Sequence, residues 1–209
     1  MTTPQMPDCY SSFERRFLAP GRQLILTALK PIVILLATLG ISPNMVSLSQ
    51  LIVGGVIALI VDDHPRAAFS LFVFAILLDG LDGSLARYTG RCSRLGAILD
   101  GLCDHAREIL MVAALAETGA LAPFWATLYA LAYPTFNLTL FLCNYHQTPL
   151  PLALKSYLVV YPALFLYLWW GINWLDEAVA LSTALMGIVI AQGLIHLQQA
   201  LDETPLAER

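Results

Sequence analysis

The stretch LLDGLDGSLARYTGRCSRLGAILDGLCDHARE, Leu77–Glu108, places four aspartates among strongly apolar residues. Asp79 and Asp82 are three residues apart, and Asp100 and Asp104 are four apart. Residues at these spacings share one face of a helix. The stretch therefore predicts two helices that are joined by a short polar loop, each with a pair of carboxylates on one face.

The composition of the whole chain is that of a membrane protein. Of its 209 residues, 58% are hydrophobic and only 12% are charged, whereas about 25% are charged in a soluble domain. The formal net charge of −4 gives no indication of a nucleic-acid partner. The four cysteines form no CxxC pair, which argues against a zinc site or a disulfide framework.

Six apolar segments are long enough to cross a bilayer, which takes about 20 residues of helix. We expect an all-α integral membrane protein with six transmembrane helices at Asn44–Val61, Ala67–Arg87, Leu95–Ala116, Ala122–Cys143, Leu152–Gly171 and Ala178–Leu201. Turn-forming sequences such as TGRCSR and NYHQTPLP separate these segments. Because the connections are short, consecutive helices are expected to be antiparallel neighbours.

A further apolar run, Leu24–Leu39, precedes the six segments and contains Lys30 and Pro31 near its middle. This interruption favours an amphipathic helix lying in the membrane interface, and a true span is the alternative. We therefore expect a cytoplasmic N-terminus with an interfacial helix over residues 1–43, followed by a transmembrane domain over residues 44–209.

The distribution of lysine and arginine predicts the orientation, because short cytoplasmic loops retain these residues. The cations that fall on one side of the expected bundle are Arg15, Arg16, Arg22, Lys30, Arg87, Arg91, Arg94 and Lys155. The opposite loops are acidic, with Arg66 as their only cation. Both termini and the four aspartates are therefore expected to face the cytoplasm, at the inner membrane if the cell is bacterial.

Four carboxylates in one low-dielectric volume need a counter-charge. An acid inside a membrane span costs about 2.5–3.5 kcal/mol even on the lenient insertion scale, and neighbouring like charges add to this cost. A site built only of oxygen ligands favours hard ions such as Mg²⁺ or Mn²⁺ over zinc. Mg²⁺ is commonly held by carboxylates together with substrate phosphates, so we expect a phosphate-bearing ligand.

Small residues and one arginine accompany the acids. Gly83 and Ala86 lie on the first of the two helices, and Gly96 lies on the second. Close helix packing is one explanation of such residues, and the approach of a bulky ligand to the backbone is the other. Arg87 is either a snorkelling arginine at the aqueous end of its helix or a fork for phosphate oxygens.

These residues together resemble the signature of the class I CDP-alcohol phosphotransferase family, also called CDP-alcohol phosphatidyltransferases. The family's spacing, Dx₂DGxxARx₈Gx₃Dx₃D, is met at every fixed position by Asp79, Asp82, Gly83, Ala86, Arg87, Gly96, Asp100 and Asp104. The sequence GISPNMVSLSQL, which begins at Gly40, is similar to the Pro-Asn-x-x-Ser/Thr start of the family's first span.

The resemblance implies a homodimer of six-helix subunits with two Mg²⁺ or Mn²⁺ ions in each. It implies transfer of a substituted phosphate from a CDP-alcohol, CDP-diacylglycerol first among them, to the hydroxyl of an acceptor alcohol, with release of CMP, in phospholipid biosynthesis. Asp79, Asp82 and Asp100 would be metal ligands, and Asp104 a ligand and the catalytic base. The residues implied in CDP binding are Asp79, Asp82, Gly83, Ala86, Arg87 and Gly96.

The sequence leaves the acceptor alcohol open. An acceptor such as inositol phosphate or glycerol phosphate needs cations beyond the metal site, and the candidate acceptor-binding residues are Arg94, His105, Arg107 and Lys155. A solvated loop charge is the alternative role for Arg94. For Arg107 the alternative is a structural pair with Glu108 or another acid.

A transporter of divalent cations or protons is the alternative function, because acids inside membrane spans also mark ion pathways. A transporter is expected to distribute acids or broken helices over both halves of its path, often in inverted repeats. This chain concentrates its intramembrane acids in one predicted hairpin. The sequence therefore favours the enzyme.

Overall fold

The computed structural model describes residues 19–151, 153 and 155–203, and every regular element in this part of the chain is a helix. The elements are α2 (Ala19–Thr38), α3 (Pro43–Ile60), α4 (Pro65–Thr89), α5 (Arg94–Glu117), α6 (Pro123–Tyr145), the 3₁₀ helix η1 (Ser156–Leu158), α7 (Val160–Trp170) and α8 (Leu175–Glu203). The expected all-α class is confirmed. The N-terminal segment before Ala19, with Arg15 and Arg16, and the predicted helix start at Leu152 lie outside the described residues.

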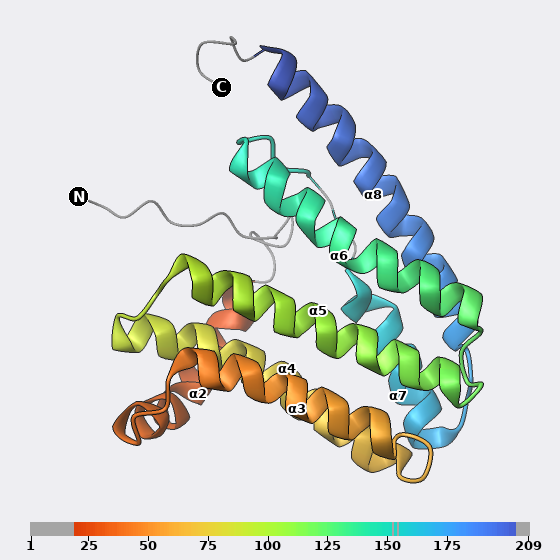
Figure 1. Ribbon diagram of the computed structural model, residues 1–209, viewed down its shortest axis with the longest axis horizontal. Coiled ribbons are helices and arrows are strands. Elements are labelled where there is room, and N and C mark those ends of the chain that lie inside the picture. The colour runs from red at the N-terminus through yellow and green to blue at the C-terminus, as the bar shows by residue number, and fades with distance from the viewer. Residues whose placement is uncertain (1–18, 152, 154, 204–209) are drawn as a thin grey trace.

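The helices form two groups (Figure 1). Helices α3, α4 and α5 run side by side, while α6 and α8 lie together at an angle to them. Helix α7 contacts both α4 and α8 and so joins the groups. The close approach of α6 to α8 depends on Gly193, because a Cβ there would collide with Thr139.

The consecutive helices α4 and α5, which were expected to be neighbours, touch each other at only a few points, such as Arg107 against Ala75. Helix α3 packs extensively on both of them, whereas α4 and α5 have little contact with each other. A Cβ at Gly54 of α3 would lie 3.4 Å from the Cα of Arg107, so α3 and α5 approach each other closely at this point. Polar side chains of α3 can therefore reach the acids of both helices.

Local signals in the sequence set the helix ends at one end of the bundle. The Ser42 hydroxyl caps α3 by accepting a hydrogen bond from the Met45 N–H at 3.3 Å. The Ser93 hydroxyl caps α5 in the same way, with the Gly96 N–H at 2.9 Å. Helix α4 ends at Gly90, whose φ of 66° is the left-handed conformation that glycine adopts readily.

Four of the described helices, α3, α4, α6 and α8, are long and apolar enough to cross a membrane. Helix α5 has 24 residues, enough to span the hydrocarbon core at about 1.5 Å per residue. Helix α5 is less apolar than these four helices, because it carries Asp100, Asp104, Arg107 and Glu108.

The fifth predicted helix is much shorter than expected. Instead of a continuous helix over Leu152–Gly171, α7 has 11 residues and follows the short η1 turn. Pro149 and Pro151 disfavour helix locally, because proline lacks an N–H donor and disfavours helical conformation in the residue before it. Further along, the backbone of Lys155 is extended. At about 1.5 Å per residue, α7 alone cannot cross a core of about 30 Å.

Helix α2 contains the predicted N-terminal apolar run and continues through Pro31. It packs along α4, where its buried Val33 joins a small apolar cluster with Leu81 and Leu85. Other side chains of α2, such as Leu35, remain exposed. Helix α2 thus attaches to the C-terminal half of α4, at the end of the bundle where the acids lie.

Candidate active site

A pocket of about 220 Å³ lies where α3 begins, α4 ends and α5 begins. Six of the eight signature residues line it: Asp82, Gly83, Ala86, Arg87, Gly96 and Asp100. The rest of the lining comes from the start of α3 and from the loop before α5 and its first turn, with Pro43, Asn44, Ser47, Arg91, Cys92, Ser93 and Ala97. Folding therefore brings most of the predicted nucleotide-binding residues around one space.

The structure explains the absence of a side chain differently at the two signature glycines of the pocket. A Cβ on Gly83 would lie 3.5 Å from Nη1 of Arg87, which is an ordinary contact, so packing within the chain does not require glycine there. A Cβ on Gly96 would lie 3.0 Å from the Ser93 hydroxyl and 3.3 Å from Oδ1 of Asn44, which is tighter than usual. Gly96 is thus needed by the helix cap, whereas Gly83 leaves room in the pocket.

The four aspartates lie near one another. Asp79, Asp82 and Asp104 are each close enough to Asp100 to repel it electrostatically. Asp82 is buried, and the other three are half-buried. Among the described side chains, no group of three or more His, Cys, Asp or Glu residues is already arranged as a metal-binding cluster.

The chemistry of this acidic cluster nevertheless fits a hard divalent cation. Oδ1 of Asp100 is buried and has no hydrogen-bond partner in the described part of the chain. A buried carboxylate oxygen without a donor, beside further carboxylates, is an unfavourable arrangement that Mg²⁺ or Mn²⁺ would relieve. The ligands offered are oxygen atoms, as these ions prefer.

Asp82 is held by side chains of α3. The Ser47 hydroxyl donates to Oδ2 of Asp82 at 2.7 Å, and Nε2 of Gln50 donates to the same oxygen at 3.2 Å. The backbone N–H of Gly83 donates to the other carboxylate oxygen. The Asp82 carboxylate is thus fixed in place by three donors.

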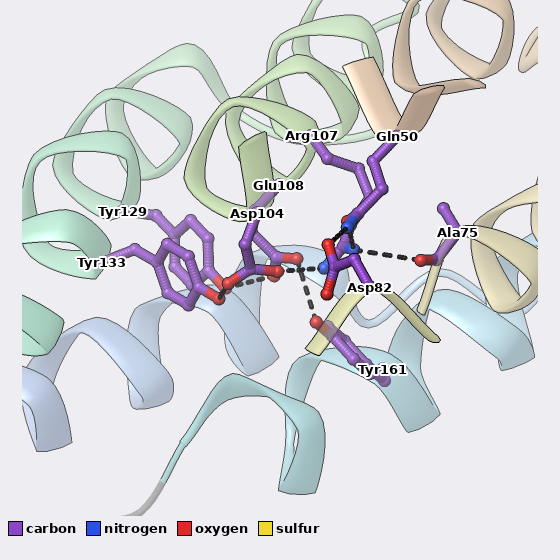
Figure 2. A network of polar contacts seen from close by, with 9 residues as sticks. All are labelled: Gln50, Ala75, Asp82, Asp104, Arg107, Glu108, Tyr129, Tyr133 and Tyr161. Carbon is purple, nitrogen blue, oxygen red and sulfur yellow. Dashed lines mark hydrogen bonds and ion pairs between the residues drawn. The ribbon is translucent and has the colours of Figure 1, made fainter. Parts of the chain in front are cut away.

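Asp104 is held by two further donors (Figure 2). Arg107 forms an ion pair with Oδ1 of Asp104, and the Tyr133 hydroxyl donates to Oδ2 at 3.1 Å. Tyr133 belongs to α6, so this contact links the two groups of helices. The sequence suggested Glu108 or another acid as the partner of Arg107. In the structure this partner is Asp104.

Glu108 forms a separate buried cluster with two tyrosines. The Tyr129 hydroxyl donates to Oε1 of Glu108 at 2.7 Å, and the Tyr161 hydroxyl donates to Oε2 at 3.0 Å. The two tyrosines come from α6 and α7, whereas Glu108 belongs to α5. This cluster ties three helices together beside Asp104.

The four candidate acceptor-binding residues are not all in one place. Arg94 is exposed and does not line the pocket. Lys155, in the segment before η1, is half-buried and interacts electrostatically with both Asp79 and His105. The His105 ring packs edge-on against Tyr133, with centroids 5.3 Å apart. Arg107 is only 2% exposed.

Sequence reasoning missed several polar residues that bond to the aspartates or line the pocket beside them. Asn44, Ser47 and Gln50 recur every three residues along α3, which places them on one face of an otherwise apolar helix. This spacing is a signal that the sequence did contain. Tyr133 has no comparable signal, because nothing near it in the sequence indicates that α6 passes Asp104.

The fold and the site define a helical membrane protein with an acidic, small-residue pocket at one end of its bundle. Residues 40–196 match the family described as CDP-alcohol phosphatidyltransferase, and the chain belongs to this family.

Curated relatives match over shorter stretches. Archaetidylinositol phosphate synthase of Aeropyrum pernix is 42% identical over 55 residues, which is 26% of this chain and 28% of that protein. Phosphatidylinositol phosphate synthase of Streptomyces avermitilis is 37% identical over 95 residues, covering 42% of this chain and 37% of that protein. The matched stretches thus span well under half of these relatives.

Solved structures share the fold over most of the chain. The crystal structure of Mycobacterium tuberculosis phosphatidylinositol phosphate synthase with CDP-DAG bound superposes with a TM-score of 0.70 at 19% identity, covering 84% of this chain and 98% of that one. The same protein in complex with manganese and citrate gives a TM-score of 0.68 at 18% identity, covering 84% and 92%.

Proposed function

We propose that this protein transfers a phosphatidyl group from CDP-diacylglycerol, or a substituted phosphate from another CDP-alcohol, to the hydroxyl of an acceptor alcohol, with release of CMP. The observation that carries the proposal is the convergence of the signature residues around one pocket beside four aspartates. A structural neighbour with CDP-DAG bound supports the choice of donor.

In this proposal the pocket binds the cytidine diphosphate. Arg87 is exposed at the aqueous end of α4, where its guanidinium can bind phosphate oxygens with two parallel hydrogen bonds. Gly83 leaves the space that the nucleotide occupies. Ala86 and Gly96 complete the small-residue wall, Asp82 also lines the pocket, and Asp79 lies one helical turn before it on α4.

Asp79, Asp82, Asp100 and Asp104 would hold two Mg²⁺ or Mn²⁺ ions, and the manganese complex of a structural neighbour supports a divalent ion. When bound, such ions neutralise charge on the pyrophosphate and on the leaving CMP. Asp104 would accept the proton of the acceptor hydroxyl, because Arg107 and Tyr133 hold its carboxylate in one orientation.

Lys155 and His105 are the residues best placed to bind the acceptor. Both lie within electrostatic range of the acidic cluster, and both are half-buried. A cation beside the cluster suits a phosphorylated acceptor such as inositol phosphate or glycerol phosphate. The relatives named archaetidylinositol phosphate synthase and phosphatidylinositol phosphate synthase, and the structural neighbour of the latter name, support this class of acceptor.

We also propose six membrane spans, with α2 lying in the interface and a second subunit completing a homodimer. The acids and Arg107 of α5 are directed toward partners inside the bundle, which allows α5 to cross the membrane. Helix α7 would cross together with the segment before it. Arg87, Arg91 and Arg94 at the pocket end support a cytoplasmic active site.

The transporter alternative is weaker than the enzyme in this structure. The acids gather at one end of the bundle, and Asp82, Asp104 and Glu108 are fixed by hydrogen bonds from neighbouring helices. Such an arrangement suits a fixed site more than a path across the membrane.

The proposal is tested by CMP release from CDP-diacylglycerol by the purified protein with Mg²⁺ or Mn²⁺. The acceptors are inositol phosphate, glycerol phosphate, inositol, serine and phosphatidylglycerol. We expect metal-dependent CMP release with one of them and loss of release with a chelator. Absence of release with every acceptor, and with CDP-linked small alcohols as donors, would contradict the proposal.

A further inference from the structure

A buried bridge connects two aspartates that lie on different helices (Figure 2). Nε2 of Gln50 donates to Oδ2 of Asp82 at 3.2 Å, and Oε1 of Gln50 accepts from Nη1 of Arg107 at 2.8 Å. Nη2 of Arg107 then donates to Asp104. The bridge therefore runs from α4 through α3 to α5.

The chemistry of the bridge allows only one orientation of the Gln50 amide. An ionised carboxylate accepts hydrogen bonds and a guanidinium only donates them. Gln50 therefore has to direct its NH₂ group to Asp82 and its oxygen to Arg107. Gln50 is 0% exposed and Arg107 is 2% exposed, so water cannot replace either bond.

Arg107 is also held from other directions. Nη1 donates to the carbonyl oxygen of Ala75 at 3.4 Å, and the guanidinium carbon lies 5.9 Å from the centroid of the Phe72 ring. Both residues belong to α4. At its base, the Cα of Arg107 packs closely against Gly54 of α3. These contacts keep the guanidinium between helices, and it does not line the pocket.

Arg107 therefore brings one positive charge to a cluster of four acids. It acts on Asp104 directly and on Asp82 through the amide dipole of Gln50. In a medium of low dielectric constant such a connected network orients its members strongly. Partners that orient metal ligands in this way tune metal affinity even though they do not touch the metal.

We infer that Gln50 and Arg107 are positioning residues that hold the Asp82 and Asp104 carboxylates in place for the divalent ions, and that Arg107 does not bind the acceptor. This inference rests on the proposed function of the same site. It decides between the two roles that the sequence left open for Arg107.

The two roles predict different measurements. A positioning role predicts that loss of either residue weakens divalent-ion binding and lowers kcat, with the KM for the acceptor unchanged. An acceptor-binding role predicts a higher acceptor KM for Arg107 variants only, with divalent-ion binding unchanged. Gln50 variants distinguish the positioning role from the acceptor-binding role most clearly. Gln50 is fully buried, and its link to Asp104 runs through Arg107.

The test uses the variants Gln50→Met and Arg107→Met, their combination, and Arg107→Lys, which keeps the charge but loses the fork. Binding of Mn²⁺ alone to the full-length purified protein is measured by electron paramagnetic resonance, and kcat and acceptor KM are measured separately. Arg66→Met is the matched control, because Arg66 is exposed at the opposite end of α4. Melting temperatures show which variants are folded.

We expect each single Met variant to weaken Mn²⁺ binding by about 10–100-fold, the effect typical of residues that orient metal ligands. The double variant should be little worse than the single variants, because both act through one bridge. Arg107→Lys should recover part of the loss, and Arg66→Met should bind Mn²⁺ normally.

The inference is overturned if Gln50→Met binds Mn²⁺ as the unmodified protein does, or if Arg107→Lys raises the acceptor KM without changing Mn²⁺ binding. Failure of the unmodified protein to bind Mn²⁺ overturns it as well. Failure of the proposed function is distinguishable, because it appears as absent CMP release while the Mn²⁺ measurements still stand. If Arg107→Met does not fold, Gln50→Met and Arg107→Lys decide the outcome.

Discussion

The Tyr133 hydroxyl of α6 donates a hydrogen bond of 3.1 Å to Oδ2 of Asp104, while Arg107 occupies the other oxygen of the same carboxylate. The proposed catalytic base is thus oriented by one residue of its own helix and by one from the other group of helices.

Replacement of the proposed base should abolish most turnover without unfolding the protein. Asp104→Asn keeps the shape of the side chain but cannot accept the proton of the acceptor hydroxyl. We expect kcat for CMP release to fall by about 10²–10⁴-fold, the usual contribution of a general base. A melting temperature close to that of the unmodified protein serves as the control, and near-normal turnover would contradict the assignment.

Removal of the Tyr133 hydroxyl should lower catalysis more than removal of the Tyr129 hydroxyl, which lies on the same helix. Tyr133→Phe leaves one Asp104 oxygen without its donor, and a hydrogen bond to a charged group contributes about 1.5–3 kcal/mol. We expect kcat to fall by at least about 10-fold, with the acceptor KM unchanged. Tyr129→Phe is the matched control because Tyr129 donates to Glu108 instead. Equal effects of the two variants on kcat would show that Tyr133 acts only through stability.

Filling the pocket at Gly83 should block the nucleotide while the fold persists. Gly83→Val adds a side chain where a Cβ meets only the flexible Arg87, so the cost in stability should be small. We expect the KM for the CDP-alcohol and the inhibition constant of free CDP to rise about 10-fold or more, since each tenfold corresponds to about 1.4 kcal/mol. Gly55→Val on α3, where a Cβ also meets no neighbour, should leave both unchanged. Unaltered CDP inhibition in Gly83→Val would contradict the placement of the nucleotide.

Loss of the Lys155 charge should weaken acceptor binding selectively. Lys155→Met retains much of the side chain but removes the ammonium group beside Asp79 and His105. A hydrogen bond to a charged group contributes about 1.5–3 kcal/mol, so we expect the KM of a phosphorylated acceptor to rise about 10-fold or more. Mn²⁺ binding should not weaken. Lys30→Met on the exposed part of α2 is the control. An unchanged acceptor KM would exclude Lys155 from the acceptor site.

Much of this site could be predicted because its parts lie close together in the sequence. The signature pairs are three or four residues apart, and helix geometry alone places such residues on one face. The pocket is lined by six of the signature residues, namely Asp82, Gly83, Ala86, Arg87, Gly96 and Asp100. The start of α3 was also visible, since Ser42 and the proline after it form a typical helix cap.

Helix neighbours and lengths were harder to predict. Hydropathy indicated a continuous fifth helix, but α7 begins only at Val160, and Lys155 lies in a non-helical segment before η1. Short loops suggested that α4 and α5 are close neighbours, and these helices do touch, but each has a much larger contact with α3. The way in which side chains of two helices interdigitate decides such packing, and apolar periodicity along one helix does not contain this information.

The sequence by itself determined the helical membrane class, the signature residues and the oxygen-rich character of the site, because these depend on composition and on spacing within single helices. Only the tertiary structure decided which side chains hold the aspartates. Gln50 and Tyr133 come from helices outside the signature, and their hydrogen bonds exist because packing brings α3 and α6 beside α4 and α5. Contacts between helices depend on interhelical packing, which no spacing along one helix contains.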